Sequence, residues 1–457
     1  MTLQARYDIV IVGARCAGAT LGTFLARAGA SVLLLDKDRL PSDQVLSTHT
    51  IHPPGMDVLD SVGVGAAVRA AAPPTHIVRL RKNDAAVDVE FGDGRAEYCP
   101  RRKRLDGLLQ DAAASAGVEL LDQARVTSLV RDGDRVIGVR AAGAGGQERV
   151  FKAQLVVGAD GRHSTVARLV EAEEYLAYDA PRAMFWGYWN APAFWHTDPA
   201  YRFGMYVANT DGHIRVIFQT DDDQLLIGSL PPTERASSWR SDPKAALIGD
   251  LSSDSTTGPL IAGSAPDGRV RGTVKERYFF RSAAGNGWTL VGDAGHHKEF
   301  VIGDGITEAL LQASTLAPAI EKGTDAALRR WWRARDVEAL PYFFLGQDEG
   351  ALGPPLELQQ VVFSHAARRP ALRERLAATM EHQLSPQETF PVRQVLWWTL
   401  GAALRGSPGV VPQFFAIGRR GSAINRELSL RRRLLAEAEA SDAQAIQITR
   451  QVGEANA

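Results

Sequence analysis

The chain has 457 residues, enough for two or three domains at roughly 150 residues each, and its 45% hydrophobic and 23% charged residues are typical of a globular protein. A formal net charge of −1 gives no overall field that would favour nucleic acid or an anionic membrane as a partner. The two cysteines form no disulfide framework, and no apolar run approaches the ~20 residues of a membrane span. No leader is apparent at the start of the sequence. We therefore expect a cytoplasmic protein that is a monomer or a homodimer.

The segment 7–36 has the order strand, glycine-rich turn, helix and strand. The apolar strand 7–12 precedes the turn, and the strand 31–35 ends at Asp36, which is followed by Lys37. This order is typical of a dinucleotide-binding unit, in which the N–H groups of the turn bind a pyrophosphate and the acid accepts a hydrogen bond from a ribose hydroxyl. The residues of the turn are Gly13, Ala14, Arg15, Cys16, Ala17 and Gly18. Arg15 replaces the middle glycine of the usual pattern, and a guanidinium there would suit a diphosphate.

Two later segments also join a buried strand to a polar turn. The strand 153–158 is followed by Asp160-Gly161 and by a Ser-x-Val sequence that opens a helix. The strand 288–291 is followed by Gly292-Asp293 and then by a helix start at 303–306. The three turns must come together for these segments to form one site, so we expect a discontinuous domain.

In the order of these three turns the sequence resembles the single-component FAD-dependent monooxygenases of the p-hydroxybenzoate hydroxylase type, over roughly residues 5–325. The resemblance implies FAD as the cofactor and NAD(P)H as a transient co-substrate, because the chain shows no second nucleotide-binding unit. It places the first turn at the FAD diphosphate, Asp36 at the adenosine ribose and Asp160 near the cofactor. It also implies contacts to FAD from Arg102, Val126, Asp293 at the ribityl chain, and Gly303, Gly305 and Ile306 at the flavin pyrimidine.

The third motif departs from the family pattern. Glu299 and Phe300 replace two prolines and Thr307 replaces an asparagine. The resemblance places this loop beside the reactive edge of the flavin, where a Glu299 carboxylate would oppose an anionic reduced flavin through like charge. The departure therefore leaves hydroxylation open to question while FAD binding is still expected.

The rest of the chain predicts an inserted domain and a helical end. We predict an α/β fold with a Rossmann-like FAD-binding domain that contains a parallel sheet (1–75, 98–180 and 280–325), an inserted antiparallel-sheet substrate domain (76–97 and 181–279) and a helical C-terminal region (326–457). Strands are expected in 76–91 and in a meander over 183–230 with turns at 209–212 and 221–223. Helices are expected at 326–339, 370–380, 392–405 and 423–440.

Aromatic residues and histidines supply the candidates for substrate binding and catalysis. Ten aromatics lie in residues 185–218, and Trp186, Tyr188 and Tyr206 are candidates for an apolar substrate pocket, although a packed sheet core explains such residues equally well. The loop that contains His49 and His52 is brought over the flavin in the family, so both are candidates for proton transfer, together with Glu299. No spacing of ligands indicates a metal site.

We therefore expect an FAD-dependent monooxygenase that oxidises an apolar or aromatic small molecule, with polyketide-like compounds among the candidates, by means of NAD(P)H and O2. Two alternatives stay open. One is a flavin-dependent dehydrogenase or double-bond reductase, and the other is a flavoprotein fold with structural FAD and a non-redox pocket for cyclisation or binding. The sequence does not identify the substrate, the choice between NADH and NADPH, or the oligomeric state.

Overall fold

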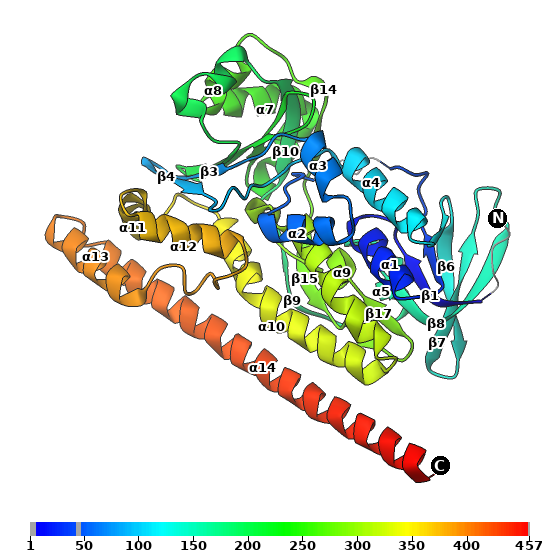
Figure 1. Cartoon of the computed structure of the whole chain (residues 1–457). Helices are drawn as coiled ribbons and strands as arrows, with labels where there is room; N and C mark the ends of the chain where they lie inside the picture. The colour runs from blue at the N-terminus through cyan, green and yellow to red at the C-terminus, as the bar shows by residue number, and fades with distance from the viewer. Residues whose placement is uncertain (1–5, 43–46, 456–457) are drawn as a thin grey trace.

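An eight-stranded sheet builds one half of the molecule in the computed structural model, which describes residues 6–42 and 47–455, with side chains as far as residue 440 (Figure 1). Its main path runs β16-β17-β8-β1-β2-β5, and β7 joins β8 to β6. The central strands are continuous apolar runs because a parallel sheet is covered on both faces. Its strands are β1 (Arg6–Val12), β2 (Val32–Leu35), β5 (Glu119–Leu121), β6 (Arg125–Asp132), β7 (Arg135–Ala142), β8 (Glu148–Gly158), β16 (Ala284–Gly285) and β17 (Trp288–Leu290).

The register of this sheet aligns the ends of its parallel strands. Val12 pairs with Leu35 of β2 and with Gly158 of β8, and Gly158 pairs with Leu290 of β17. Four strands from distant parts of the sequence therefore end at one row, and the three turns that follow β1, β8 and β17 meet at one edge. Ligands of open α/β sheets bind at this edge.

Helices cover one face of this sheet, and α1 packs between α4 and α9. The first helix, α1, buries nine of its twelve residues, most of them alanine, glycine and threonine, so it can lie close to both neighbours. The helices of this half are α1 (Cys16–Arg27), α2 (Pro53–Ser61), α3 (Gly65–Ala71), α4 (Arg102–Ser115), α5 (Thr165–Leu169) and α9 (Gly305–Glu321).

A seven-stranded sheet builds the second half, in the order β14-β10-β13-β12-β11-β3-β4. The hairpins join at 211–212 and 220–223, within the turns expected from the sequence. Residues alternate between the faces of β10: Trp186 and Tyr188 lie on one side, and Phe185 and Trp189 pack on the other. The strands are β3 (Ile77–Lys82), β4 (Ala85–Glu90), β10 (Met184–Asn190), β11 (Met205–Thr210), β12 (His213–Gln219), β13 (Gln224–Leu230) and β14 (Asp267–Thr273).

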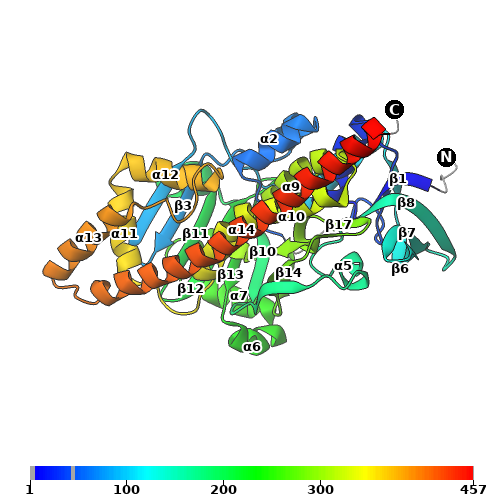
Figure 2. The same ribbon diagram turned by 90° about the horizontal axis from the view of Figure 1, so that it is seen from below.

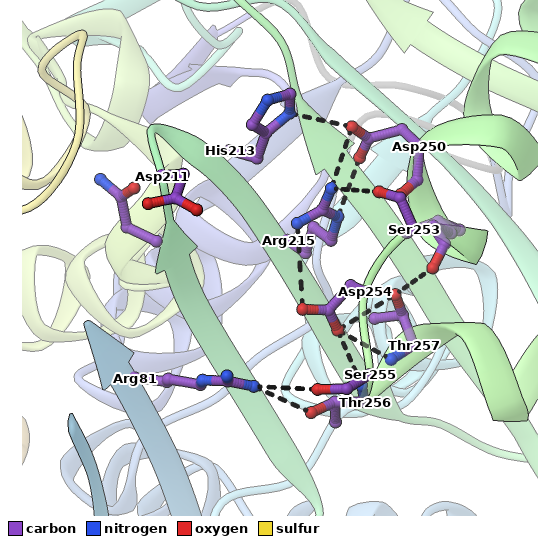
Figure 3. A network of polar contacts seen from close by, with 12 residues as sticks. Arg81, Asp211, His213, Arg215, Asp250, Ser253, Asp254, Ser255, Thr256 and Thr257 are labelled. Carbon is purple, nitrogen blue, oxygen red and sulfur yellow. Dashed lines mark hydrogen bonds and ion pairs between the residues drawn. The ribbon is translucent and has the colours of Figure 1, made fainter. Parts of the chain in front are cut away.

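Three short helices close the second face of this sheet, namely α6 (Ala236–Ser241), α7 (Pro243–Ser252) and α8 (Thr257–Ile261). A buried polar network holds them to the strands, and Figure 3 shows Arg215 of β12 at its centre. The Arg215 guanidinium donates to Asp250 at 3.0 Å and to Ser253 at 3.0 Å, and lies 3.9 Å from Asp254. The guanidinium offsets part of the negative charge of the two carboxylates, and each of these groups would be costly to bury alone.

The C-terminal region is helical, as predicted, but its pattern differs in three places, the first of which is α10, which continues to Glu349 although the predicted helix ended at 339. The helix α11 lies in a stretch where none was expected, and α14 is much longer than the predicted helix at 423–440 and runs along the length of the molecule (Figures 1 and 2). The helices are α10 (Asp325–Glu349), α11 (Glu357–Ala367), α12 (Pro370–Met380), α13 (Val392–Leu404) and α14 (Val410–Ala455). Among the described residues, none of the helices is both long enough and apolar enough to cross a bilayer.

A small antiparallel sheet completes the architecture and consists of β9 (Glu174–Asp179), β15 (Arg277–Arg281) and β18 (His296–His297). It packs against α10 through a separate core that contains Tyr278, Phe280 and Phe343. The α/β fold class, with parallel and antiparallel sheets and a helical C-terminal region, is confirmed. The domain boundaries stay a prediction.

Candidate functional site

A large cavity lies where the three turns meet. It has about 1700 Å³ of empty space, its open mouth included. Thirteen of the fifteen residues predicted to bind the cofactor line it, namely Gly13, Arg15, Cys16, Ala17, Asp36, Lys37, Arg102, Val126, Asp160, Asp293, Gly303, Gly305 and Ile306. The other two, Ala14 and Gly18, lie within the wall of the turn.

The glycine turn is closely packed. Gly13 has φ +108°, and a Cβ atom there would lie 2.3 Å from the carbonyl oxygen of Ala159. A Cβ at Gly18 would lie 1.8 Å from the oxygen of Gly13. Both positions therefore require glycine. The turn leads into the N-terminus of α1, which no side chain caps, so its first N–H groups are available to an anion.

Asp36 fixes the shape of this turn. One carboxylate oxygen accepts a hydrogen bond from the backbone N–H of Ala14 at 2.9 Å, and the other accepts one from the backbone N–H of Asp38 at 2.9 Å. Each oxygen keeps a second lone pair for a ligand hydroxyl. Arg15 turns its guanidinium toward Asp38, at 2.8 Å, and Ser42, at 3.2 Å.

A buried ion pair supports the adjoining wall. Arg102, at the start of α4, donates two hydrogen bonds to Asp106, at 2.9 and 3.0 Å, and still reaches the cavity. Cys16 donates to the same carboxylate at 3.3 Å, and burial raises the pKa of its thiol to about 12. Cys16 is therefore a packed neutral residue and not a nucleophile.

The second turn and the Gly-Asp motif bring two carboxylates to the cavity. Asp160 accepts hydrogen bonds from Ser164 and from the N–H of Thr165, at 2.5 and 2.6 Å, and so orders the start of α5. Asp293 lies 3.4 Å from His297. Burial lowers the pKa of His297, but the Asp293 and Glu276 carboxylates outweigh it and raise the value to about 9, so this imidazole is a cation at neutral pH.

Sequence reasoning missed His297, which lines the cavity together with His296. His296 stacks on Phe280 at 4.3 Å, and burial lowers its pKa to about 3. The two rings lie on opposite sides of β18. Because consecutive side chains of a strand point to opposite faces, the adjacency of the two histidines could have predicted that they lie in different surroundings.

The third motif ends at the N-terminus of α9. Gly303 adopts φ +69°, and α9 begins at Gly305. The side chain of its N-cap residue accepts no hydrogen bond from the first N–H groups of the helix. Glu299 lies in the wall of the cavity, and its carboxylate packs against the end of α10. It accepts a hydrogen bond from Tyr278 at 3.0 Å, and its other oxygen is buried without a partner.

Gly346 of α10 and Gly350, which follows the last residue of that helix, make the space for this carboxylate. A Cβ at Gly346 would lie 2.9 Å from the Glu299 Cβ, and a Cβ at Gly350 would lie 2.7 Å from its Oε2. They are four residues apart and therefore lie on the same side of the helix. Burial raises the pKa of Glu299 to about 7, so this side chain is close to half protonated at neutral pH.

Lys298 lies between two acids beside the cavity. Its ammonium donates to Asp304 and to Glu308, the latter at 2.8 Å, and His382 contacts Asp304 at 3.0 Å. Asp304, Glu308 and His382 hold ligand atoms within 4.8 Å of one another, an arrangement that a metal ion could use. The ammonium of Lys298 already supplies positive charge between the two carboxylates, so we assign this group to ion pairing.

The two loop histidines are buried beside the cavity and do not line it. His49 adopts φ +66°, and its Nε2 lies 2.5 Å from the Tyr188 hydroxyl. Burial, with Arg102 and Arg101, lowers the pKa of His49 to about 3, so the ring is neutral. The Nδ1 atom of His52 pairs with the Glu97 carboxylate at 2.5 Å. The backbone N–H of His52 donates a hydrogen bond to the Thr307 hydroxyl at 2.9 Å, and this bond connects the loop to α9.

The aromatic candidates do not form one pocket. Trp186 packs in the core between the second sheet and the C-terminal helices, and Tyr188 packs against the edge of that core. Tyr206 lies on the opposite face of the sheet, in the core that contains Phe203. This corrects the expectation for Tyr206, because the strand places its side chain away from the cavity. Met184 and Phe300 supply the apolar wall instead.

The residues of this cavity fit FAD. The close-packed glycine turn and the uncapped α1 N-terminus suit a diphosphate, Asp36 suits a ribose, and the cavity continues past Asp293 to the α9 N-terminus. The chain matches the model of the FAD-binding domain family over residues 6–324. The protein therefore belongs to this family of FAD-binding proteins, and the resemblance to flavoprotein monooxygenases of the p-hydroxybenzoate hydroxylase type is confirmed.

Two curated relatives illustrate the range of the family. The chain is 32% identical over 173 residues to 6-methylpretetramide 4-monooxygenase of Streptomyces rimosus, a match that covers 36% of this chain and 41% of the relative. It is 28% identical over 172 residues to digeranylgeranylglycerophospholipid reductase 1 of Methanococcoides burtonii, covering 36% of this chain and 40% of the relative. The chain thus spans about two fifths of the length of these relatives.

Solved structures share the fold over most of the chain. A flavoprotein/dehydrogenase from Cytophaga hutchinsonii superposes with a TM-score of 0.74 at 15% identity, covering 87% of this chain and all of that one. PqsL from Pseudomonas aeruginosa, a probable FAD-dependent monooxygenase, superposes with a TM-score of 0.62 at 20% identity, covering 81% and 99%. At these identities the likeness shows the fold alone.

Proposed function

We propose that the protein is an NAD(P)H-dependent FAD monooxygenase that inserts oxygen into an apolar or aromatic, polyketide-like small molecule. The observation that carries this proposal is the meeting of three flavin motifs in one cavity whose far end has an apolar wall at Met184 and Phe300. The relative that acts on a pretetramide, by its name, supports the substrate class. Cytoplasmic location, small-molecule binding and a monomeric or dimeric state belong to the same proposal.

In this proposal the chain's own residues hold and orient the cofactor. The N–H groups of the glycine turn bind the diphosphate, Asp36 accepts from the ribose, and Lys37 and the Asp106-paired Arg102 line the same cavity. Asp293 would accept from the ribityl chain, with His297 holding its carboxylate ionised. Bound FAD supplies the redox chemistry with O2, and the protein contributes position and exclusion of water.

The helix α9 would supply electrostatic stabilisation. Its first N–H groups, at Gly305 and Ile306, carry the partial positive charge of a helix N-terminus and line the cavity. A negative charge that develops on a bound cofactor at this end would be stabilised there. The neutral His49 ring and the Tyr188 hydroxyl are paired beside the cavity without lining it, so they would support its wall and not contact the substrate.

A turnover assay tests the proposal. Purified protein should be yellow with one non-covalent FAD per chain, and a substrate should cause NAD(P)H oxidation coupled to O2 consumption. Asp36→Ala should weaken FAD binding by roughly 1.5–3 kcal/mol, the range for a hydrogen bond to a charged group. A colourless protein that FAD cannot reconstitute would refute the central claim.

A flavin-dependent double-bond reductase is the second candidate. The matched reductase of Methanococcoides burtonii favours it, and so does the packing of Trp186 and Tyr188, which leaves little aromatic surface on the cavity wall. A reductase would reduce its substrate anaerobically and consume no O2 in a substrate-dependent manner. Product formation with the flavin left oxidised would instead indicate structural FAD and a non-redox pocket.

A further inference from the structure

The helix α13 is apolar on two opposite sides. Trp398, Thr399 and Ala402 are buried against the core of the C-terminal region. The outer side, which we call the α13 face, is formed by Val392, Leu396, Trp397, Leu400 and Leu404, with exposed fractions of 68%, 40%, 72%, 43% and 89%. A helix that is apolar all round is normally enclosed, and apolar exposure of this kind marks an interaction site.

This face lies at an outer end of the molecule. In both views α13 and the turn into α14 form the end opposite to the N-terminus (Figures 1 and 2). The start of α14 extends the exposed apolar surface with Phe415 and Ile417. The surface is therefore accessible without opening any packed contact.

Arginine is the charged residue type of the segment that carries the α13 face, although Glu388 and Glu427 border that segment and a carboxylate oxygen of Glu357 lies near Gly409. Between residues 389 and 426 the chain has five arginines and no lysine, aspartate or glutamate, although its overall net charge is −1. Arg420 pairs with Asp348 at 2.9 Å. Among the side chains that the structure describes, no carboxylate lies within ion-pair distance of the other four, which are Arg393, Arg405, Arg419 and Arg426.

We propose that the α13 face docks the protein on the surface of an anionic lipid bilayer. Exposed tryptophan and leucine beside arginines are the composition of helices that lie in a membrane interface, where the apolar side chains enter the acyl boundary and the arginines contact lipid headgroups. The binding is peripheral, because none of the described helices could span a bilayer.

The charge pattern favours a membrane over a second copy of the chain. A symmetric dimer through this face would bring the same surface against itself. The arginines would then face arginines with no carboxylate from residues 389–426 to pair with them, and like charges across an interface are costly. An anionic bilayer supplies both an apolar interior and the missing negative charge.

Vesicle flotation of the full-length protein with FAD tests this inference independently of the reaction that it catalyses. The protein should float with vesicles of phosphatidylcholine mixed with phosphatidylglycerol and stay unbound with phosphatidylcholine alone. Arg393→Gln with Arg405→Gln should weaken partitioning about fivefold per arginine, and added salt should weaken it further. Trp397→Ser with Leu404→Ser should weaken it at least about tenfold.

Matched controls come from β8, where Arg149 and Val150 are also exposed. Arg149→Gln and Val150→Ser should leave flotation unchanged, and unchanged FAD content and melting temperature should show that all variants fold. Absence of binding to anionic vesicles, or equal binding to phosphatidylcholine alone, overturns the proposal. Light scattering gives a second outcome that overturns the proposal. If the wild type is a dimer that does not bind vesicles, and if Trp397→Ser with Leu404→Ser converts it to a monomer, the face serves self-association.

Discussion

The carboxylate of Glu299 should make the protein less stable as the pH rises. Burial raises its pKa to about 7 in the folded chain, against an ordinary value of 4.5. The folded state therefore holds this proton more tightly than the unfolded state between these two values. Stability from this group is fully present below pH 4.5 and is lost as the pH rises to about 7.

The size of the effect follows from the same two values. A tenfold difference in proton affinity corresponds to about 1.4 kcal/mol, so ionisation of Glu299 costs about 3 kcal/mol of folding free energy above pH 7. Glu299→Gln removes this cost, and its amide oxygen can still accept from Tyr278. We expect the melting temperature to rise by roughly 5 °C at pH 9 and to change little at pH 5.

Thermal melts of both proteins at the two pH values provide the assay, and Glu173→Gln, at an exposed position, provides the control. A variant that is less stable than wild type at pH 9, or that shifts equally at both pH values, would refute the reasoning. The same pair tests the influence of the carboxylate on the flavin. Glu299→Gln should raise the flavin reduction potential only above pH 7, where the wild-type carboxylate is ionised.

Three further outcomes are expected. Gly13→Val should abolish FAD binding, seen as loss of the yellow colour, because its Cβ would lie 2.3 Å from the Ala159 oxygen; retained FAD would contradict this account of the turn. Arg215→Met should destabilise the fold by about 3–5 kcal/mol in urea titrations while FAD affinity is retained, since it leaves two acids without their buried partner. Cys16 and Cys99 should react slowly with a thiol reagent at pH 8, because burial raises the pKa of both thiols; rapid labelling of the native protein would show that they are accessible.

Much of the cofactor site could be predicted from the sequence because its signals are local. A turn that needs glycine at Gly13 and an acid at the end of a buried strand are read within one βαβ unit, and parallel pairing then fixes where the turns meet. Strand turns at 209–212 and 221–223 were predictable for the same reason, since turn chemistry is carried by a few adjacent residues.

Features that depend on contacts between distant segments could not be predicted. The sequence placed Glu299 beside the flavin, but the packing of its carboxylate against Gly346 and Gly350 at the end of α10 could not be predicted from it. Residue type alone gave no basis for separating Tyr206 from Trp186, because the sheet's alternation and the packing of α6, α7 and α8 decide which face each one joins.

The sequence by itself determined the family, the cofactor and the order of strands and turns, because these follow from backbone requirements within short segments. Only the tertiary structure decided the protonation of His297 and Glu299 and the exposure of the α13 face. Burial, nearby charge and the arrangement of packed helices set these properties, and they arise between residues far apart in the chain.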